Sequence, residues 1–549
     1  MARKLTLSTV RRAVGYTTGA GAAGGAVTFA YLYQTEPGFE RSVRFWGRTA
    51  PIVAHYFLER ALSRGDDIDR EARYLRLHDR YAPAAREVVE ELRGMFVKVA
   101  QVMSVRPEVV PLAYRTEFRK LQDKAPPVRW EPIREALERD LGAPVGKIFD
   151  EIDEVPLGAA SIGQAHHVIW KGREAVVKVQ YPDSASMLWA DFRCLQGLLW
   201  LVSPDALPML SQVWEQFATE LDYAAEALNL RDLHVAFEAA PEFAGRICVP
   251  EPIPELTSGN VIGMGYLPGP KLETALRARL EALGVDVGSQ SMGDWLASQQ
   301  RHGLAAEMDG AGQDASASSA GRPGGEASSE EPGRASWWWR LGRSAVRLLG
   351  LDLVLWLARS ASDLKSSGGP NGELRSTLRL LLDAHGYQLF FCPLFNADPH
   401  PGNILMLPDG RIGLIDFGQC RRLVTEEKAG LARLILAIAR PPSPDADEQL
   451  AAAFEATGVR TKHGDRQYLA LLPRLMFSRV QAEWLETGNL KEVLLRDRVV
   501  EMPIHVVMAY RTAVLLRGLC LVLQENVSVA ETWGPWAQKW LHENPIAGV

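Results

Sequence analysis

Apolar residues recur every three or four positions between Arg86 and Val105, which predicts an amphipathic helix with one buried face. The residues expected on that face are Val89, Leu92, Phe96, Val99 and Met103. Lys98 and Gln101 fall together on another face, so their side chains can reach one target. On an arbitrary helix such a pair would simply be solvated, and the pattern alone therefore assigns it no function.

Glu174 to Gln180 has the pattern of a strand, with β-branched residues on either side of a single cation, Lys178. A charged lysine inside such a run is costly unless it is paired or bound to phosphate, so the sequence predicts an anionic partner or ligand for Lys178. The preceding segment, 156–166, has alanines where a phosphate-binding loop would carry glycines. We therefore expect a stiff loop with few backbone N–H groups able to close on a triphosphate.

Two polar motifs further along the chain flank a predicted hairpin. Asp398 and Asn403 have the spacing Asp-x-x-x-x-Asn, and Asp416 begins an Asp-Phe-Gly. The turn signal at 407–411 joins two short apolar runs, which brings Asp416 back beside Asn403. Phosphoryl transfer needs one carboxylate beside the acceptor oxygen, and an amide and a second carboxylate on Mg²⁺. A lone Asp-Phe-Gly would indicate only a polar loop, but together the motifs predict Asp398 as base and Asn403 and Asp416 as metal ligands.

Five motifs in this order resemble the UbiB-type atypical kinases, also called aarF-domain-containing kinases, from about Leu75 to Arg422. Two of these motifs are the strand with Lys178 and the catalytic loop, which runs from Asp398 to Asn403 and is followed by the Asp-Phe-Gly. The family's Lys-x-Gly-Gln signature is matched from Lys98 to Gln101, except that Ala100 replaces its glycine. The other matches, to the alanine-rich loop and to the Glu-x-Asp element with its trailing Glu-Ala-x-Asn, involve Ala159, Ala160, Ser161, Glu220, Asp222, Glu226 and Asn229.

The resemblance implies an α+β protein with a two-lobed protein-kinase-like fold, an N-terminal helical extension and C-terminal helices. It implies a site for ATP or ADP with Mg²⁺, in which Lys178 holds the α and β phosphates and Glu220 pairs with Lys178. Asp222 and Glu226 would address the helical extension or polar groups of the cleft, although the spacing itself leaves open which carboxylate faces Lys178. The Lys-x-x-Gln signature would point from the extension into the nucleotide site and close it to protein substrates.

Two departures from the family pattern bear on this site. The link between the lobes is expected at 261–269, with Met264 near the nucleotide, and there Gly265 removes a glutamate that the family usually has. Adenine contacts at such links are mostly backbone hydrogen bonds, so we expect nucleotide binding to survive. Asn396 stands where many members have a histidine that braces the catalytic loop, and this change leaves the phosphoryl-transfer residues themselves in place.

Length and composition fit this organisation. The chain has 549 residues, 47% of them apolar, which is ample for a kinase-like core with extensions. Residues 300–335 are rich in Asp, Gly, Ser, Ala and Glu without periodicity, which predicts a disordered insertion. We expect a targeting or membrane segment at 1–35 and the helical extension at 36–150. The small lobe is expected at 151–270, the large lobe with its insertion at 271–440, and C-terminal helices at 441–549.

Charge and cysteine content narrow the partners and the compartment. The net charge of −6, without a dominant basic cluster, argues against nucleic-acid binding. The five scattered cysteines indicate free thiols in a reducing compartment.

Residues 1–35 carry four cations and no acid before Glu36, which is typical of a transit peptide and predicts a mitochondrion, or alternatively a plastid. The uncharged run 13–33 is either a membrane span or part of a cleaved presequence. Trp337 to Trp339 begin either an interfacial helix or a core helix.

These observations favour a membrane-associated atypical kinase-like protein that binds ATP or ADP with Mg²⁺ and hydrolyses ATP slowly. By resemblance, its partners would be a membrane surface and either membrane lipids or isoprenoid-quinone intermediates, in quinone biosynthesis or organelle lipid homeostasis. One alternative is an inactive nucleotide-binding pseudokinase that acts as a scaffold or lipid-sensing switch. Another is a small-molecule kinase, against which the helix bearing Lys98 and Gln101 speaks because it would crowd an acceptor pocket.

Overall fold

The computed structural model describes residues 31–282 and 372–545 apart from gaps, the longest of which are 63–66, 105–109, 122–126, 215–220 and 480–492. The predicted transit segment before residue 31, the insertion at 300–335 and the tryptophans at 337–339 therefore lie outside the described residues. Tertiary contacts divide the chain into two units. The first comprises Met1–Arg139, Val155–Ala165 and Val179–Leu221, and the second Asp140–Glu154, His166–Lys178 and Asp222–Val549.

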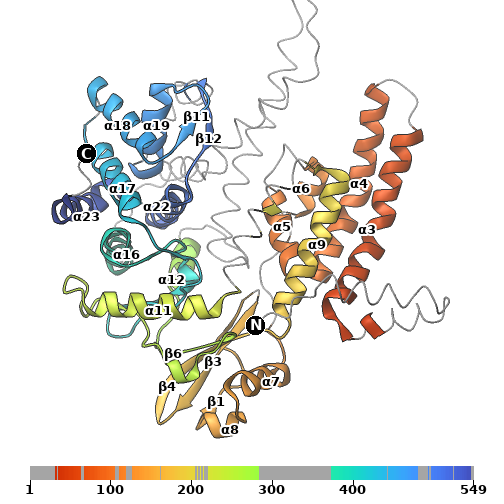
Figure 1. Ribbon diagram of the computed structural model, residues 1–549, viewed down its shortest axis with the longest axis horizontal. Coiled ribbons are helices and arrows are strands. Elements are labelled where there is room, and N and C mark those ends of the chain that lie inside the picture. Colours follow the sequence, from red (N-terminus) through yellow and green to blue (C-terminus); the bar gives the residue numbers. More distant parts are fainter. Residues whose placement is uncertain are drawn as a thin grey trace, which may run out of the picture. The chain divides into compact units, whose positions relative to one another are not determined.

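The first unit is mainly helical (Figure 1). Helix α9 packs along α3, and the two helices run in the same direction. Near the start of α3, a Cβ on Gly38 would lie 3.0 Å from the Cβ of Ala190, and further along, the Trp46 ring would lie 3.1 Å from a Cβ on Gly197. Arg41 of α3 donates to both carboxylate oxygens of Asp191 on α9, at 2.8 and 2.7 Å, and so joins the two helices. The helices of this unit are α3 (Pro37–Leu62), α4 (Asp67–Leu92), α5 (Met95–Ser104), α6 (Leu112–Phe118), α9 (Ser184–Val202) and most of α7 (Trp130–Leu141), up to Arg139.

The amphipathic pattern between Arg86 and Val105 is confirmed in its buried face but not in its continuity. All five apolar positions predicted for that face are buried. The helix, however, is interrupted where Arg93 and Gly94 both adopt left-handed backbone angles, each with φ of 55°. Glycine takes this conformation without strain and ends the hydrogen-bonding pattern of α4. The result is two helices, and Lys98 and Gln101 belong to the shorter one, α5.

A sheet of five strands has the order β1-β3-β4-β6, with β2 paired to β3. β3 and β4 each contribute residues to both units. The hydrogen bonds of β1 to β3 are antiparallel, and Glu151 lies opposite Ile169. The strands are β1 (Glu151–Ile152), β2 (Gly158–Ala159), β3 (Gly163–Trp170), β4 (Arg173–Gln180) and β6 (Val261–Gly265). Helices α7 (Trp130–Leu141) and α8 (Val145–Ile148) precede the sheet in the chain.

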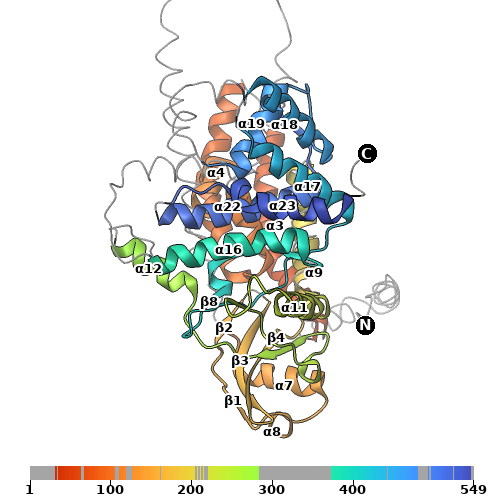
Figure 2. The same cartoon turned by 90° about the vertical axis from the view of Figure 1, so that its left-hand side faces the viewer.

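The rest of the second unit consists of short strand pairs and a group of helices (Figure 2). A three-stranded sheet has the order β5-β9-β8, and β7 pairs with β10 and β11 with β12. These strands are β5 (Ile247–Cys248), β7 (Phe395–Asn396), β8 (Ile404–Met406), β9 (Ile412–Leu414), β10 (Cys420–Arg421), β11 (Arg460–Thr461) and β12 (Val499–Glu501). The helices are α11 (Tyr223–Glu238), η2 (Pro254–Leu256), α12 (Leu272–Ala282), α16 (Gly372–Phe391), η3 (Pro401–Asn403), α17 (Thr425–Ile438), α18 (Pro444–Ala456), α19 (Arg466–Phe477), α22 (Ile504–Val522) and α23 (Val529–Glu543). The predicted α+β class with N-terminal and C-terminal helices is confirmed.

Helix α22 is, among the described helices, the one long and apolar enough by composition to cross a membrane. Within the most apolar 18-residue stretch of this helix, however, 72% is buried inside the protein. Its Arg517 is fully buried and donates hydrogen bonds to the backbone carbonyls of Leu475 and Ser478. A helix that is apolar all round and packed in this way is a core helix of the second unit.

Helix α16 leads into the loop that carries Asp398 and Asn403 and is fixed by close packing against α23. A Cβ on Gly386 would lie 2.6 Å from the Trp533 ring, so only glycine allows this approach. The indole Nε1 of Trp533 donates to the carbonyl of Leu382 at 2.8 Å. Near the end of α16, the side chain of Gln388 accepts a hydrogen bond from the backbone N–H of Asn396. The position of the helix therefore determines where the loop begins.

His385 on α16 should make the stability of the protein depend on pH. Its Nδ1 lies 2.7 Å from the carbonyl of Leu381 and its Nε2 is buried without a partner. Burial lowers the pKa of His385 from 6.5 to about 4. Because the unfolded chain then binds more protons, stability should fall as pH drops from about 6.5 to 4, by a total of about 3 kcal/mol from this group. Urea unfolding of the wild type and of His385→Gln at several pH values measures this, and equal pH dependence in the two proteins would contradict it.

Candidate functional site

Lys178 is positioned by strand β4, as the strand pattern predicted. Ala175, Val177 and Val179 are fully buried on one face of the strand, and Lys178 lies on the other face. Its Nζ is 2.6 Å from Oε1 of Glu226 and 5.1 Å from the centre of the Tyr223 ring. The predicted need of this lysine for an anionic partner is therefore met inside the second unit.

Asp416 completes a cluster of one cation and two carboxylates. The Nζ of Lys178 lies 4.0 Å from Oδ2 of Asp416, which is an ion-pair distance but not a hydrogen bond. Burial acts to lower the pKa of Lys178, but the charges of Asp416 and Glu226 outweigh it and raise the pKa. Burial raises the pKa of Glu226, and the charge of Lys178 opposes that rise. Lys178 is thus held as a cation between two carboxylates.

Glu226 is the acidic residue of α11 that contacts Lys178. Glu226, rather than Glu220, is the described partner of Lys178, and Glu220 itself lies outside the described residues. Asp222 is the N-cap of α11, and its Oδ1 accepts a hydrogen bond from the N–H of Ala225 at 2.9 Å. Because this cap starts the helix at Tyr223, the first-turn residue Glu226 is the one that reaches Lys178.

The Asp-Phe-Gly segment is fixed by α11 and by its own backbone. The side-chain amide of Asn229 donates to the carbonyl of Phe417 at 3.1 Å. The N–H of Gly418 donates to Oδ1 of Asp416 at 3.0 Å, which sets the carboxylate of Asp416. The sequence named Asn229 only through the family motif. The fully buried Tyr223, next to Lys178, was missed, because no spacing rule distinguishes it from any other core aromatic residue.

The catalytic loop is tied to the Asp-Phe-Gly segment through Asn396. Its Nδ2 donates to the carbonyl of Asp416 at 2.8 Å, and its Oδ1 accepts from the N–H of Asp398 at 2.9 Å. The strand pair β7–β10 adds a second link, in which Asn396 lies opposite Cys420. The side chain is nearly fully buried, so these contacts are shielded from water. Asn396 thus links the segment of Asp398 to the Asp-Phe-Gly segment.

The predicted hairpin brings Asn403 next to Asp416. Strands β8 and β9 pair with Ile404 opposite Leu414, and the carbonyl of Asn403 accepts from the N–H of Ile415 at 3.1 Å. The turn between them closes at Gly410, which has φ of 84°. Asp398 is half-buried, and among the described residues no ion pair is formed by its carboxylate. Asp398, Asn403 and Asp416 therefore lie on adjoining segments of one unit, as the spacing predicted.

A Mg²⁺ ion fits the donors that this arrangement presents. Oδ1 of Asp416 accepts the hydrogen bond from Gly418, Oδ2 lies 4.0 Å from the Nζ of Lys178, and the side chain is 38% exposed. Among the described residues, no group of three or more His, Cys, Asp or Glu side chains could hold a metal alone. Mg²⁺ characteristically uses one or two protein oxygens together with substrate phosphates and water. Asp416 and Asn403 would hold such an ion, which would neutralise phosphate charge when bound.

The other predicted site residues are distributed over both units. Ala159 is in β2 and Ala160 follows it, and the N–H of Ala160 donates to the carbonyl of Gly163 in a tight turn. Ser161 and the side chains of Lys98 and Gln101 lie outside the described part of the structure. In the second unit, Met264 is buried in β6 and is followed by Gly265, at which a Cβ would make only ordinary contacts with Glu251.

A family model named ABC1 atypical kinase-like domain matches residues 120–292 and 364–448. Both matched segments contain residues of the site, Lys178 and Glu226 in the first and the catalytic loop with Asp416 in the second. The chain carries an ABC1 atypical kinase-like domain. The predicted resemblance to the UbiB-type, aarF-domain-containing family is thereby confirmed, and the ABC1 match supports the kinase-like interpretation of the Lys178–Glu226–Asp416 cluster.

Several curated relatives bear the same family name. ACTIVITY OF BC1 COMPLEX KINASE 8, a chloroplastic protein of Arabidopsis thaliana, is 28% identical over 286 residues, which are 50% of this chain and 37% of that protein. An ABC1 family protein of Schizosaccharomyces pombe is 26% identical over 244 residues, 43% of this chain and 44% of the relative. An uncharacterized protein of Synechocystis is 24% identical over 472 residues, 83% of this chain. The chain spans only 55% of the length of that last relative.

Solved structures show more distant similarity. The complex of Rv3197 with erythromycin from Mycobacterium tuberculosis is 22% identical and covers 79% of this chain and 90% of that chain, with a TM-score of 0.40. A ternary complex of the aminoglycoside phosphotransferase APH(4)-Ia with AMP-PNP and hygromycin B is 13% identical and covers 76% and 99% of the two chains, with a TM-score of 0.20.

Proposed function

We propose that the ABC1-type domain binds ATP or ADP as a Mg²⁺ complex and hydrolyses ATP slowly. The observation that carries the proposal is the cluster in which Lys178 lies between Glu226 and Asp416, joined to the catalytic loop through Asn396. A lysine held by a carboxylate, beside a second carboxylate that can take a metal, is the arrangement that kinases use on nucleotide phosphates. Asp398 would then accept the proton of the attacking water or hydroxyl group.

The biological setting proposed is an organelle membrane, where the protein supports isoprenoid-quinone biosynthesis or lipid homeostasis. Two features support it: the cation-rich, acid-free start of the chain, and relatives that are named chloroplastic. Those names favour a plastid over the mitochondrion that the sequence favours. A reporter fused to residues 1–33 tests the address, and retention of the reporter in the cytosol would contradict both organelles.

The test of the proposed activity is ATP turnover by the full-length protein with and without lipid vesicles, with Mg²⁺ varied. Slow Mg²⁺-dependent release of phosphate supports the proposal. Tight nucleotide binding without turnover under any condition would favour a pseudokinase scaffold or lipid-sensing switch. A phosphorylated small molecule, found when metabolite extracts are incubated with labelled ATP, would favour a small-molecule kinase.

For the alanine-rich loop, the family resemblance gives a separate prediction. Replacing Ala160 by Gly should raise the affinity for ATP several-fold, because a freer loop can turn one or two more N–H groups toward phosphate, each worth about 0.5–1.5 kcal/mol. Titration of the wild type and of Ala160→Gly with ATP and ADP measures the difference. Equal affinities in the two proteins would remove the loop from the nucleotide site.

A further inference from the structure

A cavity of about 470 Å³ lies within the helical first unit, and none of Lys178, Glu226 and Asp416 lines it. Its walls come from α3, α4, α5, α6 and α9. Most of the lining side chains are aliphatic or aromatic, such as Val53, Val99 and Leu199. Pockets that bind small molecules have volumes of roughly 300–1,000 Å³ and this mainly apolar character. Closely packed protein interiors rarely leave a space of this size, so the cavity is large enough to be considered as a binding site.

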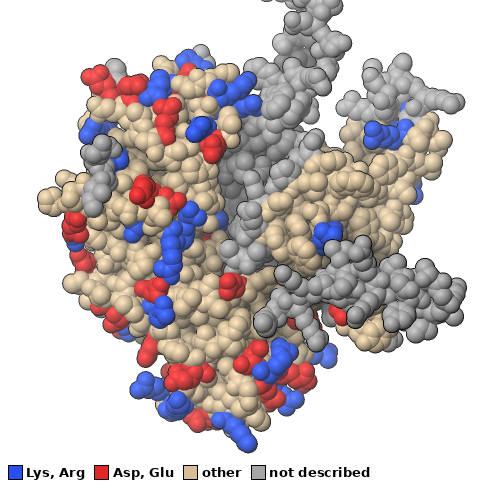
Figure 3. All heavy atoms as spheres, viewed as in Figure 1, with Lys and Arg blue, Asp and Glu red and all other residues tan. Residues whose placement is uncertain are grey.

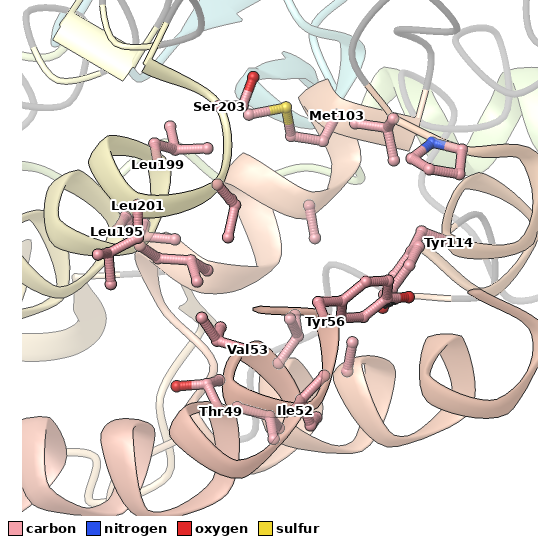
Figure 4. Close-up of a pocket in the computed structure, with 18 of the residues that line it drawn as sticks. Thr49, Ile52, Val53, Tyr56, Met103, Tyr114, Leu195, Leu199, Leu201 and Ser203 are labelled. Carbon is pink, nitrogen blue, oxygen red and sulfur yellow. Dashed lines mark hydrogen bonds between the residues drawn. The ribbon is translucent and has the colours of Figure 1, made fainter. Parts of the chain in front are cut away.

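One side of the cavity is polar but uncharged. The hydroxyl of Tyr56 lies 2.8 Å from Nδ1 of His78 and 3.1 Å from the hydroxyl of Tyr114. Burial is the main cause that raises the pKa of Tyr56 and of Tyr114 and lowers the pKa of His78, so all three are neutral at neutral pH. Figure 4 shows Tyr56 and Tyr114 side by side, with Leu195, Leu199 and Leu201 on the opposite side of the cavity.

The cavity opens to the surface among apolar side chains. Phe57 and Leu201 both line it and are 42% and 38% exposed. Because Trp46 lies opposite Gly197, α9 ends beside the middle of α3. Each helix carries a further exposed apolar residue, Leu62 at 67% on α3 and Trp200 at 66% on α9. Figure 3 shows few charged side chains over α3, α4 and α9 on the face that it presents. An apolar opening suits entry of a ligand that is itself poorly soluble in water.

We propose that this cavity binds a single-chain amphiphile, namely an aliphatic or isoprenoid chain that ends in a neutral hydroxyl or carbonyl group. The chain lies against the leucines and valines, and the neutral head exchanges hydrogen bonds with Tyr56, His78 and Tyr114. Arg60 is the one Lys or Arg among the described lining residues, and it is exposed, so its charge stays in water and does not select an anionic head. The proposal rests on the lipid part of the proposed function and is independent of the nucleotide part.

The test is equilibrium dialysis of the full-length protein against radiolabelled dodecan-1-ol. Val53→Trp fills the cavity, and Tyr56→Phe removes one hydroxyl without changing shape. Leu58→Trp is the matched control, because Leu58 is on the same helix, 56% exposed and outside the cavity. We expect one bound molecule per chain in the wild type and in the control, a loss of at least tenfold in affinity for Val53→Trp, and a loss of about twofold to tenfold for Tyr56→Phe.

Several results would overturn the proposal. Absence of binding to the wild type removes the site, and wild-type affinity in a folded Val53→Trp protein places the ligand elsewhere. If Val53→Trp fails to fold, as judged by circular dichroism, Tyr56→Phe decides, since unchanged affinity there rejects the headgroup assignment. Dodecanoate that binds as tightly as dodecan-1-ol would reject a neutral head. Asp416→Asn should bind dodecan-1-ol like the wild type, so a failure at the nucleotide site is distinguishable from a failure at the cavity.

Discussion

Replacing Asp416 by Asn should abolish Mg²⁺-dependent nucleotide binding and lower any ATP turnover by more than about a hundredfold, while the fold remains intact. A metal at phosphate supplies several kcal/mol of charge stabilisation, and each 1.4 kcal/mol lost is a factor of ten. The side chain is 38% exposed and asparagine has the same shape, so the substitution removes charge and little packing. Titration with ADP at several Mg²⁺ concentrations measures the effect.

The matched control for Asp416→Asn is Asp409→Asn. Asp409 belongs to the same hairpin, in the exposed turn, where its carboxylate pairs with Arg411. This change removes an equal charge from the same part of the chain but none from the cluster around Lys178. Nucleotide affinity should therefore stay within about twofold of wild type, because exposed ion pairs contribute little. If a folded Asp416→Asn protein kept its Mg²⁺ dependence, the kinase-type site would be refuted.

Replacing Glu226 by Gln should weaken ADP binding at least tenfold and destabilise the protein by about 1.5–3 kcal/mol. Glu226 is 4% exposed and makes the shortest contact of Lys178, so its loss leaves a largely buried cation without a hydrogen-bonded counterion. Among the described residues, Asp416 is then the remaining ion-pair partner of Lys178, and it is the carboxylate proposed to hold the metal. Urea unfolding and ADP titration together measure the two effects.

Glu220→Gln is the comparison that makes the Glu226 prediction specific. The family resemblance assigns the pairing with Lys178 to Glu220, whereas the structure assigns it to Glu226. We therefore expect Glu220→Gln to change the equilibrium constant of unfolding and the dissociation constant of ADP each by less than about twofold. A larger loss from Glu220→Gln than from Glu226→Gln would return the role to Glu220.

Local rules were sufficient for the parts of the site that lie close together in sequence. The turn at 407–411 and the apolar runs beside it determine the hairpin, and the hairpin alone brings Asn403 to Asp416. Strand β4 follows from its alternating β-branched residues, and the costly charge of Lys178 implies its partner. These conclusions need no knowledge of how distant elements pack.

Other features depend on packing between distant segments, which a single sequence does not reveal. Which carboxylate faces Lys178 depends on the residue at which α11 begins. The N-cap hydrogen bond of Asp222 determines that residue. Arg93 adopts a left-handed conformation that is uncommon for its residue type, so the break between α4 and α5 has no sequence signal at that residue. The cavity is formed by helices up to about 150 residues apart in the chain, and no periodicity within one helix predicts a void between several.

The sign of the charge cluster has a consequence for the order in which ligands arrive. One ammonium group between two carboxylates leaves an excess of one negative charge around Lys178 when no ligand is bound. A free triphosphate approaching this cluster is repelled, whereas a metal ion, or a triphosphate already carrying one, is attracted. The cluster therefore discriminates between metal-free and metal-bound nucleotide before any contact with the base or sugar is made. In a cell, free magnesium and not only total nucleotide would then govern how much of the protein is occupied.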